Sequence, residues 1–366
     1  MTPLPPQNGP HAPMDLKPMS AKTLRASTPL RIAGVLVDLF TRVGQREPPE
    51  PHKSQHARFI SIAVSNYVEK ARWGLDLLEA NAKSPLYLTE DLHPPALHAF
   101  QTVRASKDQA SQSPMVVLAD GRVLWGSDDI LRQICNDEQT VDLYPAEIKK
   151  DIMAMEDDLG KGLGASVRCY GYYCLCDKSK KYYGIAAKFL TPHCPKAETF
   201  LFSKMLDKGL AKGMLKTMNV TEESGEASEK EIRQVFDDLS KRLEANGGGY
   251  LMDTPNKKYG FTAADLTLGA LSYLVIRPPE MQPFLTPESE LPPRMVQLGK
   301  DVRETTAGKH VLKIYKEHRP INKGTGEIEI KKVDQNRIPW VEIAGTTTLL
   351  GAISYGVMVL KSPTTI

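Results

Sequence analysis

The stretch from Phe59 to Leu78 constrains the fold more than any other part of the sequence. An apolar run from Phe59 to Val64 suits a short strand that is covered on both faces. After Ser65, apolar side chains recur at helical spacing. The sequence therefore predicts a buried strand, a sharp turn and an amphipathic helix. One face of this helix should pack on the sheet, and we expect its charged side chains to face water; they are Glu69, Lys70 and Asp76.

Ser65 occupies the junction between this strand and this helix. A hydroxyl here lies beside free backbone N–H groups and the positive end of the helix dipole, where a bound thiol is favoured as the thiolate. A helix N-cap without any chemical role explains the same residue. The two interpretations, a thiol-activating serine and a simple cap, both stay open at the level of this motif.

Composition narrows the class of protein. The chain has 366 residues, of which 41% are hydrophobic, so it is long enough for two domains and appendages. Its net charge of only +3 gives no support for a nucleic acid partner. Five cysteines, an odd number, indicate reduced thiols. Because no paired CxxC spacing is present, we expect no metal site in the region that holds Cys169, Cys174, Cys176, His193 and Cys194.

Residues 1–55 precede the first predicted domain. Residues 1–28 are rich in Pro and Ser and lack an apolar period, which predicts disorder. Residues 30–44 predict a helix with an apolar face flanked by arginines. This fits an organellar presequence, a surface-seeking helix or a helix packed on the domain. Residues 47–55 then read as a linker.

Residues 56–138 alternate strand and helix signals. After the opening strand and helix come a second strand from Pro85 and a short helix from Ala96 to Arg104. Two further strands are joined through a hairpin turn at Asp120-Gly121. Ser127 is a good N-cap for the next helix, with Asp128 in its first turn. The order strand, helix, strand, helix, hairpin, helix predicts an α/β thioredoxin-like domain.

Residues 145–320 show helical periodicity and almost no strand signal, which predicts an all-α second domain. Within it, the polar stretch from Glu222 to Glu229 predicts a loop. The following helix ends at Gly247-Gly248-Gly249. Thr262 and Asp265 have the spacing of a capping box and so predict the start of another helix.

Three of these segments together resemble the cytosolic glutathione transferase family. They are, in order, SNYVEKARWGLDLL, SPMVVLADGRVLWGSDDIL and FTAADLTLGALSYL. The first resembles the active-site turn and first helix of that family, the second its proline-containing strand and serine-headed helix, and the third its helical-domain capping box. The resemblance covers roughly Arg58 to Arg319. It implies a thioredoxin-like domain followed by a helical domain, with glutathione as co-substrate and no metal.

The resemblance also implies roles for individual residues. Ser65 takes the catalytic position, where family members hydrogen-bond the glutathione thiolate. The Ser113-Pro114 bond is expected to be cis, which exposes the backbone that pairs with the cysteinyl part of glutathione. Ser127 and Asp128 stand at the helix N-terminus that holds the γ-glutamyl carboxylate.

Two positions depart from the family pattern. Gly126 stands where many members have Glu or Gln on the γ-glutamyl group, and Asn66 stands where Pro is common. Tyr67 is interpreted as a structural aromatic of the turn. Because Ser65 is not a cysteine, the pattern argues against the thiol-transfer and reductase branch.

A pocket for an electrophile is expected between the two domains, lined by Arg168 and Tyr172 and within reach of Tyr173. The alternative is that the tyrosines are core or interface aromatics. The resemblance leaves open whether the chain forms a homodimer.

Beyond a linker at residues 321–339, the segment from Ile343 to Leu360 carries no charge. Its eighteen residues would span about 27 Å as a helix, close to a bilayer core of roughly 30 Å. Trp340 and Lys361 flank it as interfacial anchors would. We expect a single tail anchor in a membrane, with both domains facing the cytosol, and leave the organelle unassigned. A soluble packed helix is the alternative.

Two functions follow from these patterns. The first is an enzyme that activates the glutathione thiol at Ser65 and adds it to a small hydrophobic electrophile. The second is a membrane-tethered binding or scaffold protein that keeps the fold without catalysis, for which Gly126 would mark a lost glutathione contact.

Overall fold

The computed structural model describes residues 56–80, 87–107, 109–134, 142–176 and 181–321, together with Lys323, Thr325, Gly326 and Ile328. The predicted segments before residue 56 and the predicted tail span from Ile343 to Leu360 lie outside these residues. Within the described part of the chain, no helix has the length and apolar character needed to cross a membrane.

A four-stranded mixed sheet forms in the first part of the described chain, in the order β2-β1-β3-β4. The strands are β1 (His56–Ile62), β2 (Tyr87–His93), β3 (Met115–Val117) and β4 (Val123–Trp125). β1 pairs parallel to β2 and antiparallel to β3, and β3 pairs antiparallel to β4. The turn between β3 and β4 carries Gly121 at a φ of 85°, as the predicted hairpin requires.

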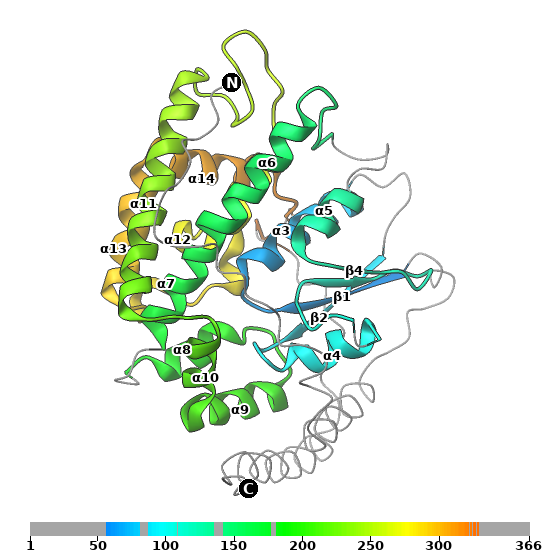
Figure 1. The fold of residues 1–366 in the computed structure, drawn as a ribbon, viewed down its shortest axis with the longest axis vertical. Helices are drawn as coiled ribbons and strands as arrows, with labels where there is room; N and C mark the ends of the chain where they lie inside the picture. Colours follow the sequence, from blue (N-terminus) through cyan, green and yellow to red (C-terminus); the bar gives the residue numbers. More distant parts are fainter. Residues whose placement is uncertain are drawn as a thin grey trace, which may run out of the picture.

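Helices cover both faces of the sheet (Figure 1). They are α3 (Asn66–Ala80), α4 (His98–Ala105) and α5 (Ser127–Ile134). α3 and α5 close an apolar core that includes Phe59, Val68 and Ile130. α4 lies on the opposite face, where Ile60 and Met115 are buried. This is the predicted thioredoxin-like arrangement, in which a two-sided sheet is covered by helices on both sides.

The rest of the described chain is helical, as predicted. Its α-helices are α6 (Lys149–Leu159), α7 (Ala165–Leu175), α8 (Tyr183–Leu190), α9 (Lys196–Met205), α10 (Ala211–Thr217), α11 (Glu222–Ala245), α12 (Ala263–Ile276), α13 (Pro293–Glu304) and α14 (Thr306–His318). Two π-helical turns, Gly160–Gly164 and Leu206–Leu210, and two 3₁₀ turns, Pro279–Phe284 and Glu288–Glu290, complete it.

α12 is the centre of the helical region, because thirteen of its fourteen residues are buried. It packs against α3, α6 and α14 within one large apolar cluster. Its start is the predicted capping box: the Asp265 carboxylate accepts hydrogen bonds from the Thr262 N–H at 3.1 Å and from the Thr262 hydroxyl at 3.0 Å. The cluster joins the sheet and the helical region through Trp73 of α3.

The predicted loop from Glu222 to Glu229 is wrong, because this stretch is the first part of α11. Thr221 and Ser224 cap the helix reciprocally: the Ser224 N–H donates to Thr221 Oγ1 at 3.1 Å and the Thr221 N–H donates to Ser224 Oγ at 2.8 Å. Polar composition does not exclude a helix whose N-terminal N–H groups are satisfied in this way. The Thr-x-x-Ser spacing was the signal that could have identified it.

The expectation that the charged residues of α3 face water is also wrong. Glu69 is 0% exposed, Lys70 1% and Asp76 7%. The physical reason is that α3 has no free side: one face packs on the sheet, and α12 and α5 cover much of the remainder. Periodicity marks the apolar face of a helix but does not show whether the polar face meets solvent or a second layer of protein.

Candidate functional site

The three segments that carry the family resemblance contribute to one edge of the sheet and to the helices beside it. Ile60 of β1 lies opposite Met115, and Met115 lies opposite Trp125. Because both pairings are antiparallel, the carboxyl end of β1 lies beside the amino end of β3 and the carboxyl end of β4. Ser113-Pro114 immediately precede β3 and Gly126-Ser127 immediately follow β4. They therefore flank the end of β1 from which the chain turns into Ser65 and α3.

Ser65 caps α3. Its carbonyl accepts the first helical bond, from the Glu69 N–H at 3.0 Å, and its hydroxyl lies 3.4 Å from the Val68 nitrogen. The hydroxyl contact is long for a hydrogen bond. Ser65 is partly exposed, so its hydroxyl can reach a ligand at the positive end of a fifteen-residue helix.

The Ser113-Pro114 peptide bond is cis, as predicted. The Ser113 hydroxyl donates to the Ile60 carbonyl at 3.4 Å, and the Pro114 carbonyl accepts from the Gly126 N–H at 3.0 Å. Pro114 is buried and Ser113 is partly exposed. The residues before β3 are thereby held against β1 on one side and against the turn into α5 on the other.

Gly126 has a φ of 89°, which lies in a backbone region that residues other than glycine rarely adopt. A Cβ atom built at this position would lie 3.6 Å from Nε2 of Gln112. The side-chain amide of Gln112 thus lies where a side chain at position 126 would begin. The sequence analysis did not single out this residue, although it stands two positions before Pro114.

Ser127 is buried, and it is the first residue of α5 rather than its N-cap. The carbonyl of Gly126 accepts the bond from the Ile130 N–H at 3.1 Å, which makes Gly126 the capping residue. Asp128 forms an ion pair with Lys70 of α3. Lys70 is buried and also lies 2.7 Å from the Glu156 carboxylate of α6. The Asp128 carboxylate is therefore partly neutralised at the entrance to α5.

Asn66 is 2% exposed and binds the helical region. Its side-chain amide donates to the Gly164 carbonyl at 2.9 Å and to the Leu271 carbonyl at 3.3 Å. A proline at this position would supply neither bond. The departure from the family pattern at Asn66 is thus explained by a contact between α3 and two helical segments, the π-turn before α7 and α12.

Tyr67 also faces the helical region. Its hydroxyl donates to the Gly160 carbonyl at 2.8 Å, and the Arg168 guanidinium lies 5.3 Å from its ring centre. Burial raises the pKa of the Tyr67 phenol, and the Arg168 charge only partly opposes this shift. A Cβ atom at Gly164 would lie 2.9 Å from the Tyr67 hydroxyl, so a larger residue there would force the two segments to shift. Arg168, predicted to line an electrophile pocket, therefore lies beside Tyr67 in the first turn of α3.

The two tyrosines of α7 have different surroundings. Tyr172 packs against the apolar cluster formed largely by α8, α9 and α10, and burial raises its pKa. Tyr173 lies against Gly225 of α11, and its hydroxyl accepts from Arg294 at 2.9 Å. Tyr173 therefore packs between helices of the helical region, as the alternative of a packing aromatic requires.

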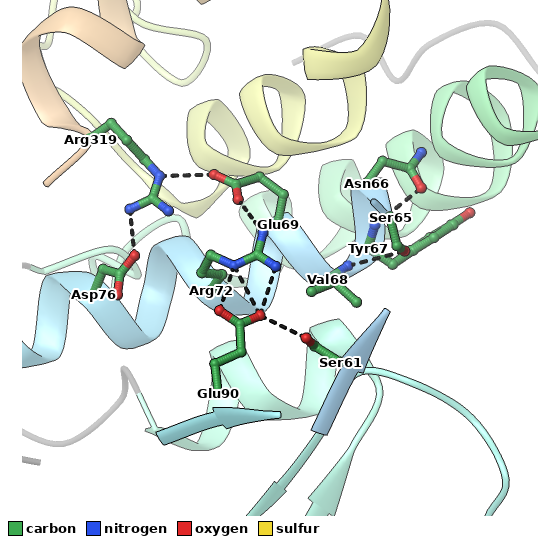
Figure 2. A network of polar contacts seen from close by, with 10 residues as sticks. All are labelled: Ser61, Ser65, Asn66, Tyr67, Val68, Glu69, Arg72, Asp76, Glu90 and Arg319. Atoms are coloured by element: carbon green, nitrogen blue, oxygen red, sulfur yellow. Dashed lines mark hydrogen bonds and ion pairs between the residues drawn. The ribbon is translucent and has the colours of Figure 1, made fainter. Parts of the chain in front are cut away.

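A network of buried charges lies along α3, beyond the turn that carries Ser65 (Figure 2). Arg72 contacts the carboxylates of Glu69 and Glu90 at 2.8 Å and 2.7 Å. Arg319, which follows α14, contacts Glu69 at 2.8 Å and Asp76 at 2.7 Å. Burial disfavours both guanidinium charges, yet the neighbouring carboxylates outweigh it and raise the pKa of Arg72 and of Arg319. The helix that carries Ser65 is thus tied to β2 and to the end of the helical region.

Within the described residues, no group of three or more His, Cys, Asp or Glu side chains is arranged to hold a metal ion. Cys169, Cys174, Cys176 and Cys194 are buried, and none of them forms a disulfide with another described residue. His193 lies with its ring edge toward Phe284, 5.6 Å between ring centres. These residues therefore take part in packing in the described part of the chain.

No protein-family model matches the sequence, and no curated protein matches it. Solved structures with a similar fold include Ure2p in complex with glutathione, at 13% identity and a TM-score of 0.41, with 75% of this chain and 99% of that chain covered. Glutathione transferase GSTFuA2 from Phanerochaete chrysosporium is 13% identical, with a TM-score of 0.46 and coverage of 74% and 100%. The GST-like domain of elongation factor 1-gamma from Saccharomyces cerevisiae is 12% identical, with a TM-score of 0.36 and coverage of 78% and 100%.

Proposed function

We propose that this protein binds glutathione at the carboxyl end of β1 and activates its thiol at Ser65 for addition to a small hydrophobic electrophile. The observation that carries the proposal is the meeting of Ser65, the cis Ser113-Pro114 peptide and the start of α5 at one edge of the sheet. The N-termini of α3 and α5 supply helix dipoles whose positive ends suit a thiolate and a carboxylate.

In this proposal each group has a separate task. The backbone beside the cis Pro114 pairs with the cysteinyl part of glutathione, and the N-terminus of α5 at Ser127 receives the γ-glutamyl carboxylate. The Ser65 hydroxyl donates a hydrogen bond to the sulfur, which lowers the thiol pKa and raises the fraction of nucleophilic thiolate. The Gln112 amide supplies a donor near the position where Gly126 lacks a side chain.

Electrophile binding is proposed beside α7. The Arg168 guanidinium lies over the ring of Tyr67, which follows Ser65 by two residues in the sequence. Tyr172 is partly exposed and stands on the same helix one turn further on. The pair offers a cation and an aromatic surface, which suits a hydrophobic substrate that develops negative charge on addition of the thiolate.

The test is titration of the purified full chain with glutathione, followed by calorimetry and by thiolate absorbance as a function of pH. The Ser65→Ala variant should retain binding but raise the pKa of the bound thiol and lower turnover by roughly tenfold to a thousandfold. Ser289→Ala is a matched control, because Ser289 is exposed and lies in a 3₁₀ turn outside the thioredoxin-like region. An unchanged thiol pKa in Ser65→Ala would remove Ser65 from the mechanism.

The second candidate is a membrane-tethered protein of the same fold that does not catalyse conjugation. Gly126 favours it, because a family contact to glutathione is missing there. Absence of glutathione binding in the wild-type titration would select this candidate over the enzyme. In both cases we propose attachment to a membrane through Ile343 to Leu360, with the folded regions facing the cytosol. Sedimentation of the glutathione-bound protein would determine whether it forms a homodimer.

A further inference from the structure

The segment that spans α8, α9 and α10 has a charge unlike that of the rest of the chain. Residues 181–217 contain seven lysines, no arginine and two acidic residues, a formal charge of +5 against +3 for the whole chain. The remainder of the protein is therefore net negative. All seven lysines are exposed, and we call them the lysine face: Lys181, Lys188, Lys196, Lys204, Lys208, Lys212 and Lys216.

Little of this charge is compensated locally. One of the two acids, Glu198, is 6% exposed and turns inward to His93, whose Nδ1 lies 2.9 Å from its carboxylate. Lys188 pairs with Glu290 at 2.7 Å. Among the described residues no carboxylate pairs with the four lysines Lys196, Lys208, Lys212 and Lys216. An uncompensated positive face of this size attracts an anionic partner.

The lysine face also holds an exposed aromatic side chain. Phe200 of α9 is 48% exposed and is the one large hydrophobic residue classed as exposed in the described part of the chain. Lys196 and Lys204 stand four residues before and after it, so the three side chains share one helix face. The Lys204 ammonium lies 5.5 Å from the Phe200 ring centre. An aromatic ring flanked by lysines is the pattern of a helix that lies flat in a membrane interface.

The inner side of the same helices is already occupied. Phe202, Leu206 and Ala211 are buried in a cluster that also includes Val64 and Leu97 of the thioredoxin-like region. The outward charge and the exposed ring are therefore not needed for packing. α8, α9 and α10 lie together at the lower left of Figure 1.

We infer that the lysine face binds an anionic phospholipid bilayer, with Phe200 inserted at the headgroup boundary and the lysines among the lipid phosphates. Lysine stems can pack along apolar surface while their ammonium groups stay at the headgroups. A nucleic acid partner is less well matched, because arginine, the residue that binds phosphate in bidentate geometry, is absent from this segment. This inference rests on neither Ser65 nor the predicted tail anchor.

The test uses a polarity-sensitive dye on the full chain, so that contact is read at the lysine face itself. The dye is attached at Gly213→Cys, an exposed helical position of α10 with open space around it. A second dye position at Glu304→Cys, where the side chain is 84% exposed, reports on a distant surface. Both variants also carry Cys135→Ser. Because the other four cysteines, at 169, 174, 176 and 194, are buried, the dye then reacts at the introduced cysteine.

We expect the dye at position 213 to shift on vesicles that contain phosphatidylserine, to shift far less on neutral phosphatidylcholine vesicles, and to return in high salt. A variant with four charge reversals on the lysine face should need on the order of a hundredfold more lipid to reach half of the dye's full shift. The four substitutions are Lys196→Glu, Lys208→Glu, Lys212→Glu and Lys216→Glu. Phe200→Ser should weaken the shift without any change in charge.

A matched variant controls for net charge and for folding. It carries Glu at four exposed lysines away from the lysine face: Lys150, Lys230, Lys300 and Lys316. This control should keep the wild-type response, and the dye at position 304 should stay unshifted. Equal shifts on neutral and anionic vesicles, or a full response in the lysine-face variant, would overturn the inference. A dye that responds to duplex RNA and not to vesicles would assign the face to nucleic acid instead.

Discussion

Arg319→Met tests whether the buried charges around α3 hold the helix that carries Ser65. Arg319 is 3% exposed and donates to Glu69 at 2.8 Å and to Asp76 at 2.7 Å. Its guanidinium also lies 5.6 Å from the centre of the Trp73 ring. Methionine keeps the approximate length and the apolar contact with Trp73 but removes both charged hydrogen bonds.

The magnitude follows from opposing terms. Each hydrogen bond to a charged group contributes about 1.5–3 kcal/mol, and removal of one partner from a buried ion pair costs about 3–5 kcal/mol. Two features reduce the loss. Glu69 still forms its ion pair with Arg72. The substitution also removes the Arg319 Nη2 atom, which is buried without a hydrogen-bond partner among the described residues. We expect the free energy of unfolding to fall by about 3 kcal/mol.

The assay is urea unfolding followed by Trp fluorescence, since Trp73 lies beside the substitution. With an m-value near 3 kcal/mol/M, the midpoint should fall by about 1 M. Arg122→Met is the control for loss of a charge, because Arg122 pairs with Asp120 on the surface, with side chains 71% and 52% exposed; its midpoint should not move. An Arg319→Met midpoint within about 0.3 M of wild type would show that the buried pair adds nothing beyond an apolar contact.

Three further predictions address other contacts. Gly164→Ala should lower stability by about 1–3 kcal/mol in thermal melting, because its Cβ would lie 2.9 Å from the Tyr67 hydroxyl, whereas Gly171→Ala on α7, with nothing within 4 Å, should not. Burial alone would lower the pKa of His93, but the Glu198 carboxylate outweighs it and raises the pKa above its ordinary value of 6.5. The stabilisation from the His93–Glu198 pair is therefore complete below pH 6.5 and is lost as pH rises through the folded-state pKa of His93. Glu198→Gln should thus lower the free energy of unfolding more in acid than in alkali. Equal losses at both ends of the pH range would refute the pairing. The full chain should resist carbonate extraction from membranes and the chain truncated after Arg337 should not; equal solubility would exclude the tail anchor.

The sequence predicted features that depend on short spans of chain. The strand before Ser65, the turn at Asp120-Gly121 and the Thr262-Asp265 capping box are all specified by residues within a few positions of one another. In each case one local rule is enough, whether apolar periodicity, turn residues or cap spacing. The cis bond before Pro114 came from family resemblance instead, because no local spacing rule distinguishes it.

The sequence did not predict contacts between distant segments. Asn66 pairs with carbonyls 98 and 205 positions away, and Arg319 pairs with Glu69 across 250 positions. A charged residue on a helix reads as solvent-facing unless a partner from another element is known. Arg72 lies three positions from Glu69, but nothing in the sequence near Glu69 indicates Arg319. The stretch from Glu222 was missed for a different reason, since its cap was present in the sequence and its polar composition was given more weight.

The same long-range contacts determine how the candidate site can work. α3 receives Glu90 from β2, Arg319 from the end of α14 and two carbonyl acceptors from the helical region. A sheet region separated from the helices would expose Glu69, Lys70 and Asp76 and leave the Asn66 amide without these acceptors. Since an active hydroxyl must be held within a fraction of an ångström of its working position, the location of Ser65 depends on the helical region as much as on the strand before it. The thioredoxin-like region and the helices should therefore be treated as one unit. The thiol activation that we propose at Ser65 predicts that substitutions far from Ser65 along α3 change the pKa of the bound thiol.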